Sequence, residues 1–213
     1  MSYERARARM IEEQLVGRGI ADPRVLAAMA RVERHRFVEE ALEARAYDDK
    51  PLPIGARQTI SQPFMVGLMT EALGLRGTER VLEIGTGCGY QTAVLAELVA
   101  NVFSVERIST LATAARQLLD RLGYYNVAIR VGDGTLGWSD EAPFDAIVVT
   151  AGTPQVPRPL ITQLADGGRL VFPIGEEELQ TLVRIRKEGS RLHEEYFGDC
   201  RFVKLVGRYG WER

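Results

Sequence analysis

The sequence predicts an α/β fold built on a doubly wound, mostly parallel sheet, with helices before the sheet and antiparallel strands after it. Three observations predict this arrangement. From residue 64 onward, apolar strand-like runs alternate with helical patterns; the opening third shows helical spacing; and the last fifty or so residues change to paired strand-like runs. Strands that alternate with helices are typical of a parallel sheet.

Residues 1–47 are predicted to form a helical cap. Met10 and Leu15 recur at helical spacing, and Asp22-Pro23 supplies an N-cap and a first-turn proline for a second helix. We expect a third short helix over residues 37–42. No repeat or low-complexity segment interrupts the chain, so we expect one domain that includes this cap.

The rest of the chain divides into three further segments. Residues 48–63 contain three prolines and one glycine without helical periodicity, which indicates a long ordered loop of the kind that often carries function. Residues 64–175 hold the alternating strands and helices. Residues 176–213 are predicted to form antiparallel strands, with a hairpin turn over residues 187–190.

Composition excludes several classes of protein. A formal net charge of −2 and a pI near 5.8 provide no field that would attract nucleic acid. The chain lacks a long apolar run and an apolar stretch after its basic start, so we expect a cytoplasmic protein with no membrane partner. Cys88 and Cys200 lack metal-ligand spacing, so we expect reduced thiols and no metal. We also expect a monomer.

A glycine-rich segment follows the first strand of the core. Residues 81–89, VLEIGTGCG, end in three alternating glycines and lead into a helix-like run. The spacing is GxGxG, because Tyr90 stands where a dinucleotide fingerprint needs its third glycine. A nucleoside without a pyrophosphate needs only a glycine floor, that is, a glycine backbone that the ligand can approach closely. The loop therefore favours S-adenosylmethionine over NAD. The alternative is that the loop is a simple tight turn.

Acidic residues accompany this loop. Glu106 closes the next strand 21 residues after Gly85, where a carboxylate can accept hydrogen bonds from ribose hydroxyls. Glu83 precedes the loop and either orients it or faces the methionine ammonium group. Asp133, between two glycines, is a candidate acceptor for the adenine amino group. Each alone is open to a simpler interpretation as a strand end or turn former.

The acceptor of the methyl group is indicated by what the sequence lacks. Strand FDAIVVTAGT carries no [DNS]PP[YFW] segment of the kind found in amino-methylating nucleic-acid enzymes, and no Pro-Cys pair is present. His35 and His193 are the two histidines, and neither is signalled as a base beside the cofactor. A carboxylate acceptor, with a pKa of about 3.5 to 4, needs no base.

Several segments together resemble the protein-L-isoaspartate O-methyltransferase family: VLEIGTGCGYQTAVLA, FSVER, GDG, FDAIVVTAG, GGRLVFPIG and, most specifically, GARQTISQPFMV. The resemblance covers nearly the whole chain. It implies a Rossmann-like class I methyltransferase with a seven-stranded sheet, S-adenosylmethionine as the cofactor and S-adenosylhomocysteine as its product. It also implies methylation of the free α-carboxylate of L-isoaspartyl residues in damaged proteins and peptides, whose ester then closes to a succinimide.

The resemblance also implies roles for individual residues. Ser61 matches the active-site serine, expected to orient the acceptor carboxylate; the alternative is a helix cap before Pro63. Arg57 and Lys204 depart from the family pattern, which bears on the peptide groove expected near residues 150–157 and the C-terminal segment. The full set of residues assigned to the cofactor is Gln58, Thr59, Ile60, Ser61, Glu83, Gly85, Thr86, Gly87, Gly89, Gln91, Glu106, Asp133 and Gly134.

Two alternatives stay open at this point. A small-molecule O-methyltransferase would share every cofactor feature but would use a hydroxyl acceptor that needs a base or a metal. A non-catalytic nucleotide-binding or RNA-binding module could be built on the same fold, because fold does not fix function.

Overall fold

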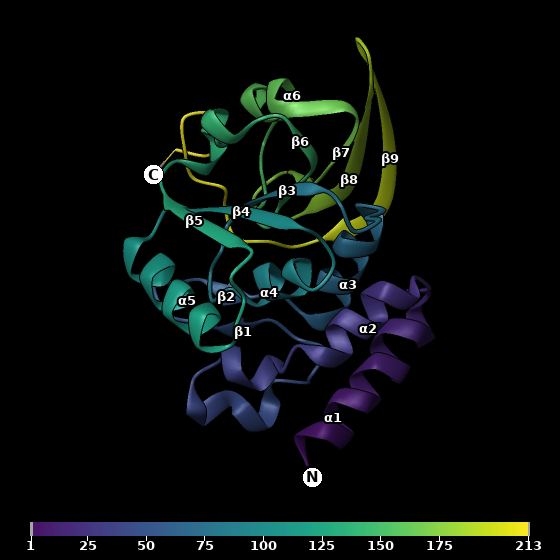
Figure 1. Cartoon of the computed structure of the whole chain (residues 1–213), viewed down its shortest axis with the longest axis vertical. Helices are drawn as coiled ribbons and strands as arrows, with labels where there is room; N and C mark the ends of the chain where they lie inside the picture. Colours follow the sequence, from purple (N-terminus) through teal and green to yellow (C-terminus); the bar gives the residue numbers. More distant parts are fainter. Residues whose placement is uncertain (1, 213) are drawn as a thin grey trace.

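The structure, a computed structural model, describes residues 2–212 around one large sheet of seven strands in the order β5-β4-β3-β6-β7-β8-β9. The first five strands of this order run parallel, and β8 and β9 are antiparallel to their neighbours. This confirms the predicted sheet (Figure 1). The strands are β3 (Arg80–Ile84), β4 (Asn101–Glu106), β5 (Val127–Val131), β6 (Phe144–Val149), β7 (Leu164–Gly175), β8 (Gln180–Glu188) and β9 (Arg191–Cys200).

Helices cover both faces of the sheet, as a doubly wound fold requires. In Figure 1, α3, α4 and α5 lie below the sheet with the N-terminal segment, and α6 lies above it. Short turns η5 and η6 take the place of a long helix between β5 and β6. The bounds are α3 (Pro63–Ala72), α4 (Tyr90–Ala96), α5 (Ser109–Arg121), η5 (Gly134–Leu136), η6 (Ser139–Glu141) and α6 (Arg158–Gln163).

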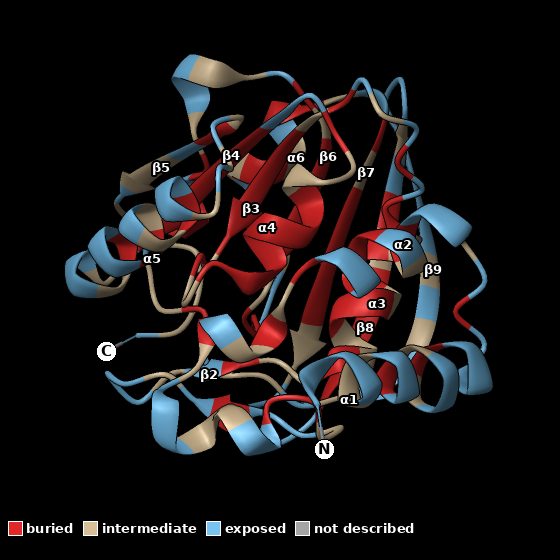
Figure 2. Cartoon of the chain, turned by 60° about the horizontal axis from the view of Figure 1, so that its bottom comes forward, coloured by how far each residue is buried: buried red, intermediate tan, exposed pale blue. Residues whose placement is uncertain are grey.

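Side chains of the central strands alternate between two apolar clusters. In β3, Val81 belongs to the cluster beneath the sheet, whereas Leu82 and Ile84 belong to the cluster around α6. All three are at most 1% exposed. Burying a side chain of this size stabilises the fold by about 1.5–3 kcal/mol, which explains the continuous apolar runs in the sequence. Figure 2 shows the buried residues concentrated in β3, α4 and β7.

The N-terminal cap follows the predicted pattern with one correction. A helical stretch of α1, η1 and η2 ends at Gly19, whose φ of 96° is left-handed, and the Asp22 side chain caps α2 by accepting the Arg24 N–H at 2.8 Å. The single helix predicted over residues 37–42 is wrong, because extended backbone at Val38 separates two 3₁₀ turns. The bounds are α1 (Tyr3–Arg9), η1 (Met10–Leu15), η2 (Val16–Arg18), α2 (Pro23–Arg31), η3 (Arg34–Phe37) and η4 (Glu40–Arg45).

The remaining segments meet at the carboxyl edge of the sheet. The loop predicted over residues 48–63 contains a short antiparallel pair, β1 (Leu52–Pro53) with β2 (Thr59–Ile60). At the other end of the chain, the antiparallel strands predicted for 176–213 stop at Cys200. Residues 201–212 instead cross the sheet edge through isolated bridges, one of which pairs Gly152 with Lys204. There the Gly152 N–H donates to the Val203 carbonyl and the Gly152 carbonyl accepts the Leu205 N–H, each at 2.8 Å.

Candidate active site

The site lies where the chain reverses its direction of travel across the sheet. From β3 the chain moves to β4 and β5, and it then returns to the other side of β3 as β6. The glycine loop after β3 and Thr150 after β6 therefore flank one crevice, and the Thr150 N–H donates to the Ile84 carbonyl at 2.9 Å. Open α/β sheets bind ligands at such a switch point.

Glycine is required at the first position of the loop. Gly85 has a φ of 100°, and a Cβ atom built there would lie 2.4 Å from Thr150 Oγ1. That hydroxyl lies 3.0 and 2.8 Å from the Ile84 and Gly85 carbonyls, between which its one proton is shared, so it is held in place. Gly87 is left-handed as well, with a φ of 54°. The backbone of the loop therefore forms the floor of the site without side chains, and a side chain at position 85 would occupy the space above it.

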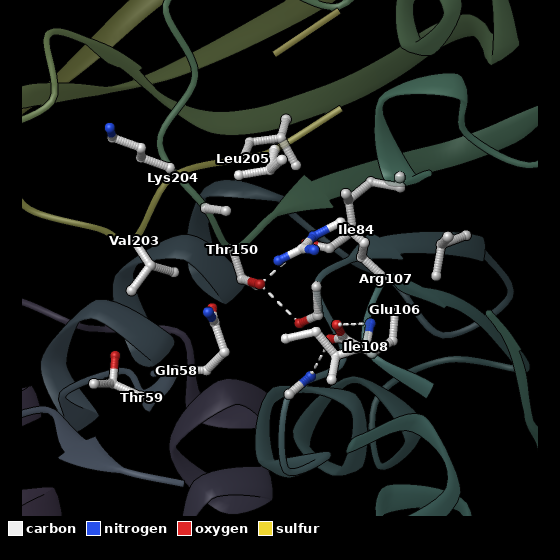
Figure 3. A pocket seen from close by; sticks show the side chains of 16 residues that line it. Gln58, Thr59, Ile84, Glu106, Arg107, Ile108, Thr150, Val203, Lys204 and Leu205 are labelled. Atoms are coloured by element: carbon white, nitrogen blue, oxygen red, sulfur yellow. Dashed lines mark hydrogen bonds between the residues drawn. The ribbon is translucent and has the colours of Figure 1, made fainter. Parts of the chain in front are cut away.

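A narrow cavity of about 70 Å³ opens above this floor. Figure 3 shows Gln58 and Thr59 on one side, Glu106, Arg107 and Ile108 on the other, and Thr150 between them. The cavity is lined by Gln58, Thr59, Ile84, Gly85, Gly87, Val105, Glu106, Arg107, Ile108, Gly134, Thr150, Ala151, Val203, Lys204, Leu205 and Val206. An open groove of about 950 Å³ adjoins it, and the two share six lining residues: Gln58, Thr59, Arg107, Val203, Lys204 and Val206.

Glu106 presents a fixed carboxylate to the cavity. Its Oε2 accepts the Gly87 N–H and its Oε1 accepts the Ile108 N–H, each at 2.9 Å. The side chain is at the end of β4 and the residue is only 6% exposed. Each oxygen keeps a further lone pair, so the carboxylate can accept two more hydrogen bonds from a diol. The ribose-binding role predicted for Glu106 requires free acceptor sites of this kind at the cavity, and it stays a prediction.

Glu83 lies beneath the loop and does not line any described cavity. Its Oε2 accepts the Thr92 and Ser104 hydroxyls at 2.5 and 2.6 Å, and the Ser104 hydroxyl is 2.6 Å from that of Thr86. Because a serine has one proton to donate, Thr86 donates to Ser104. Burial raises the pKa of Glu83 to about 8. Of the two predicted roles, the geometry supports orientation of the loop.

Asp133 is occupied by backbone donors. Its Oδ1 accepts the Thr135 N–H at 2.9 Å, which caps η5, and its Oδ2 accepts the Arg208 N–H at 2.8 Å. The carboxylate thus ties the C-terminal segment to the sheet edge. Asp133 lines a side cavity with Arg107 and Trp211, next to the cavity above the glycine loop. Since Oδ1 also accepts the Thr135 hydroxyl at 2.7 Å, a contact with adenine would have to use the lone pair left on Oδ2.

Ser61 faces a small cavity that adjoins the glycine floor. This cavity is shared with Thr59 and Thr150, which also line the larger one. Helix α3 is capped by Gln62 rather than by Ser61, and within residues 2–212 the Ser61 hydroxyl has no hydrogen-bond partner. The alternative prediction that Ser61 caps the helix is therefore wrong. Its carbonyl accepts the Arg34 Nη2–H at 2.7 Å.

Not every residue assigned from the sequence meets in the cavity. Ile60 is 4% exposed in the apolar core, Gln91 donates its amide N–H to Thr70, and Gly89 packs on α5. The members that do line the cavity are Gln58, Thr59, Gly85, Gly87, Glu106 and Gly134. The other lining residues were not assigned to the cofactor from the sequence, although Thr150, Ala151 and Lys204 lie in segments expected near the peptide groove. They are Ile84, Val105, Arg107, Ile108, Thr150, Ala151, Val203, Lys204, Leu205 and Val206.

Membrane-spanning helices and clusters of metal-ligating side chains are absent from the part of the chain that the structure describes. Within residues 2–212, no helix is long and apolar enough to cross a membrane. Over the same range, no group of three or more His, Cys, Asp and Glu side chains is arranged to hold a metal ion.

A glycine floor at the switch point of this seven-stranded sheet, with an acidic side chain ending the neighbouring strand, defines a class I S-adenosylmethionine-dependent methyltransferase. The profile of the protein-L-isoaspartate(D-aspartate) O-methyltransferase family matches residues 5–210. The chain belongs to this family.

Individual relatives are similar to this chain in sequence over nearly their full length. The protein-L-isoaspartate O-methyltransferase of Syntrophus aciditrophicus is 59% identical over 98% of this chain and 97% of its own. That of Geobacter metallireducens is 60% identical over 99% and 98%. The sequence-based recognition of the family is confirmed.

Solved structures agree as well. A protein-L-isoaspartate O-methyltransferase superposes with a TM-score of 0.86 at 31% identity, covering 96% of this chain and 67% of the other. A Plasmodium falciparum structure assigned to the same enzyme, in complex with S-adenosyl-L-homocysteine, gives a TM-score of 0.81 at 28% identity, covering 94% and 98%.

Proposed function

We propose that this chain transfers a methyl group from S-adenosylmethionine to the free α-carboxylate of L-isoaspartyl residues in damaged proteins and peptides. The single observation that carries the proposal is the position of Ser61. Ser61, whose hydroxyl has no hydrogen-bond partner within residues 2–212, lines a cavity that shares Thr59 and Thr150 with the cavity above the glycine floor. An acceptor held by Ser61 would therefore sit next to the cofactor.

The chain supplies the groups that hold the cofactor. The bare backbone of Gly85 and Gly87 permits close approach, and Glu106 offers two prealigned oxygens to a ribose diol. Gln58 and Thr59 lie across the cavity from Glu106. When bound, S-adenosylmethionine provides an electrophilic methyl group on a sulfonium centre.

The acceptor chemistry needs little more from the protein. An α-carboxylate is ionised at neutral pH, so its oxygen can form the new O–CH₃ bond without a base while the S–CH₃ bond breaks. Holding two reactants in line supplies much of the rate enhancement. We assign this positioning to Ser61, whose O–H would donate to the carboxylate oxygen that does not react. Closure of the ester to a succinimide then releases methanol without the enzyme.

The test is transfer of labelled methyl from S-adenosylmethionine to two synthetic peptides that differ only in one L-isoaspartyl or normal aspartyl residue. Base-labile label on the isoaspartyl peptide alone is expected. Label on neither peptide, while calorimetry shows that S-adenosylhomocysteine binds, would contradict the proposal and favour a small-molecule acceptor.

We further propose that the chain acts as one domain and as a monomer in the cytoplasm, with no nucleic acid partner. The single domain is supported by the cap, because Leu15, Val25 and Met29 join the same apolar cluster as Val81 of the sheet. The other three parts of this proposal rest on the sequence composition. Sedimentation equilibrium would test the monomer, and a single cooperative unfolding transition would test the single domain.

A further inference from the structure

The groove beside Ser61 carries an excess of positive charge. Five cationic side chains line it, against three acidic ones. The cations are Arg18, Arg57, Arg107, Arg201 and Lys204, and the acids are Glu177, Glu178 and Asp199.

Ion pairs neutralise three of these five cations. Arg18 pairs with Asp49 at 2.6 Å, outside the groove lining. Arg201 pairs with Glu178 at 2.5 Å, and Lys204 with Glu177 at 2.7 Å. Within residues 2–212, Arg57 and Arg107 form no ion pair with a protein side chain.

The two remaining arginines differ in position. Arg107 lines the cavity above the glycine loop as well as the groove, whereas Arg57 lines only the groove. Arg57 is exposed, so its guanidinium is available to a ligand that lies in the groove. A charged group without a partner in a substrate groove is available for an opposite charge on the substrate.

The backbone at Arg57 is unusual. Arg57 has a φ of 57° and Ala56 a φ of 48°, both in the left-handed region. Residues with a side chain pay roughly 1–2 kcal/mol there, and glycine would not. The turn is fixed by hydrogen bonds from the Gln58 N–H to the Gly55 carbonyl at 2.8 Å and from the Ile54 N–H to the Gln58 carbonyl at 3.0 Å. Backbone strain that is kept beside a site motivates a functional hypothesis for the segment that carries it, here residues 55–57.

We propose that Arg57 is a specificity-determining residue that favours isoaspartyl substrates with an acidic side chain roughly two to four residues from the isoaspartyl position. Arg57 and Ser61 are four residues apart. At about 3.3 Å per extended residue, at most about 13 Å separates their Cα atoms, which an extended peptide spans in about four residues. This inference rests on the proposed function, because it places the isoaspartyl carboxylate at Ser61.

The experiment uses three isoaspartyl peptides that carry Glu, Gln or Lys at positions two to four from the isoaspartyl residue. Initial rates of methyl transfer at low ionic strength give kcat/KM for each. We expect kcat/KM for the Glu peptide to be roughly two- to fivefold higher than for the isosteric Gln peptide, as for an exposed ion pair. This ratio of kcat/KM values should shrink as the salt concentration increases.

Variants separate Arg57 from the overall charge of the protein. Arg57→Lys is expected to keep most of the preference, and Arg57→Glu to invert it in favour of the Lys peptide. Arg191→Glu is the matched control, because Arg191 is exposed at the far turn of the β8–β9 hairpin and the change in net charge is identical.

The outcomes are distinct. This inference would be overturned by equal kcat/KM values for the three peptides. It would also be overturned if Arg57→Glu and Arg191→Glu changed the ratio of kcat/KM between the Glu and Gln peptides equally. Either result would leave isoaspartyl methylation intact. Methylation of none of the three would overturn the proposed function itself, and this inference with it.

Discussion

The Arg34 guanidinium donates from Nη2 to the Ser61 carbonyl at 2.7 Å and from Nε to the Ala46 carbonyl at 2.7 Å. Arg34 is 0% exposed, and its guanidinium stacks over the Tyr90 ring at 4.7 Å, at the start of α4. Burial lowers the pKa of this arginine. One buried side chain thus joins the cap, the segment that carries Ser61 and the helix after the glycine loop.

Arg34→Lys is expected to lower kcat for an isoaspartyl peptide between about ten- and a hundredfold, because displacement of a reacting group by about 1 Å has effects of this size. A lysine is a point donor that cannot bridge both carbonyls. Cofactor affinity should change much less than kcat. Arg31→Lys, at an exposed position that contacts Glu97, is the control. Full activity of Arg34→Lys would show that the bridge does not position Ser61.

Ser61→Ala should lower kcat/KM for the isoaspartyl peptide by about ten- to a hundredfold, the range for one hydrogen bond to a charged group. Binding of S-adenosylhomocysteine, measured by calorimetry, should stay unchanged because Ser61 faces the adjoining cavity. Ser109→Ala, at an exposed position in α5, is the matched control. An unchanged kcat/KM would remove Ser61 from the mechanism.

Glu106→Gln should weaken binding of S-adenosylhomocysteine by about ten- to a hundredfold. The amide has one acceptor oxygen, so it cannot serve the Gly87 and Ile108 N–H groups and a diol together. Glu97→Gln, a change at a partly exposed carboxylate on α4's C-terminal side, provides the comparison. Equal affinities of Glu106→Gln and the unaltered protein would contradict a ribose-binding role.

Glu83 should make stability depend on pH. Its pKa in the folded protein is about 8 because of burial, above the value of about 4.3 in an unfolded chain. The folded state therefore keeps a proton that the unfolded chain has released between these values. The free energy of unfolding contributed by this group falls as pH rises through that window and levels off above it.

Glu83→Gln removes this titration and keeps an oxygen that can accept the Thr92 and Ser104 hydroxyls. The free energy of unfolding can be measured by urea unfolding at about pH 5 and about pH 8. Between these two conditions it should fall by up to a few kcal/mol more for the unaltered protein than for the variant. Parallel pH profiles of the two proteins would mean that Glu83 is ionised in the fold.

Ala56→Gly should raise the melting temperature by about 1–4 °C, because relief of left-handed strain exceeds the added entropy of the unfolded chain. Ala114→Gly is the matched control, since Ala114 is exposed in the middle of α5 and the same change should lower stability there. Destabilisation by both changes would indicate that residues 55–57 adopt a different turn.

Much of the fold was predictable because its signals are local. The alternating runs predicted the central strands, and Asp22-Pro23 predicted the start of α2, since capping involves neighbouring residues. The third helix was not predicted correctly, because the extended conformation of Val38 depends on packing rather than on helical spacing. The hairpin of β8 and β9 was predicted from its turn residues.

The sequence by itself determined the family, the glycine floor and the acidic strand end, because these depend on residue types at short, fixed spacings. Only the tertiary structure decided which assigned residues face the cavity. It turned Gln91 toward Thr70, placed Glu83 beneath the loop, and brought residues 203–206 over Gly85. The reason is physical: a side chain's direction depends on how strands pair and helices pack in three dimensions, and for Gly85 and residues 203–206 this brings together segments more than a hundred residues apart, which no local spacing records.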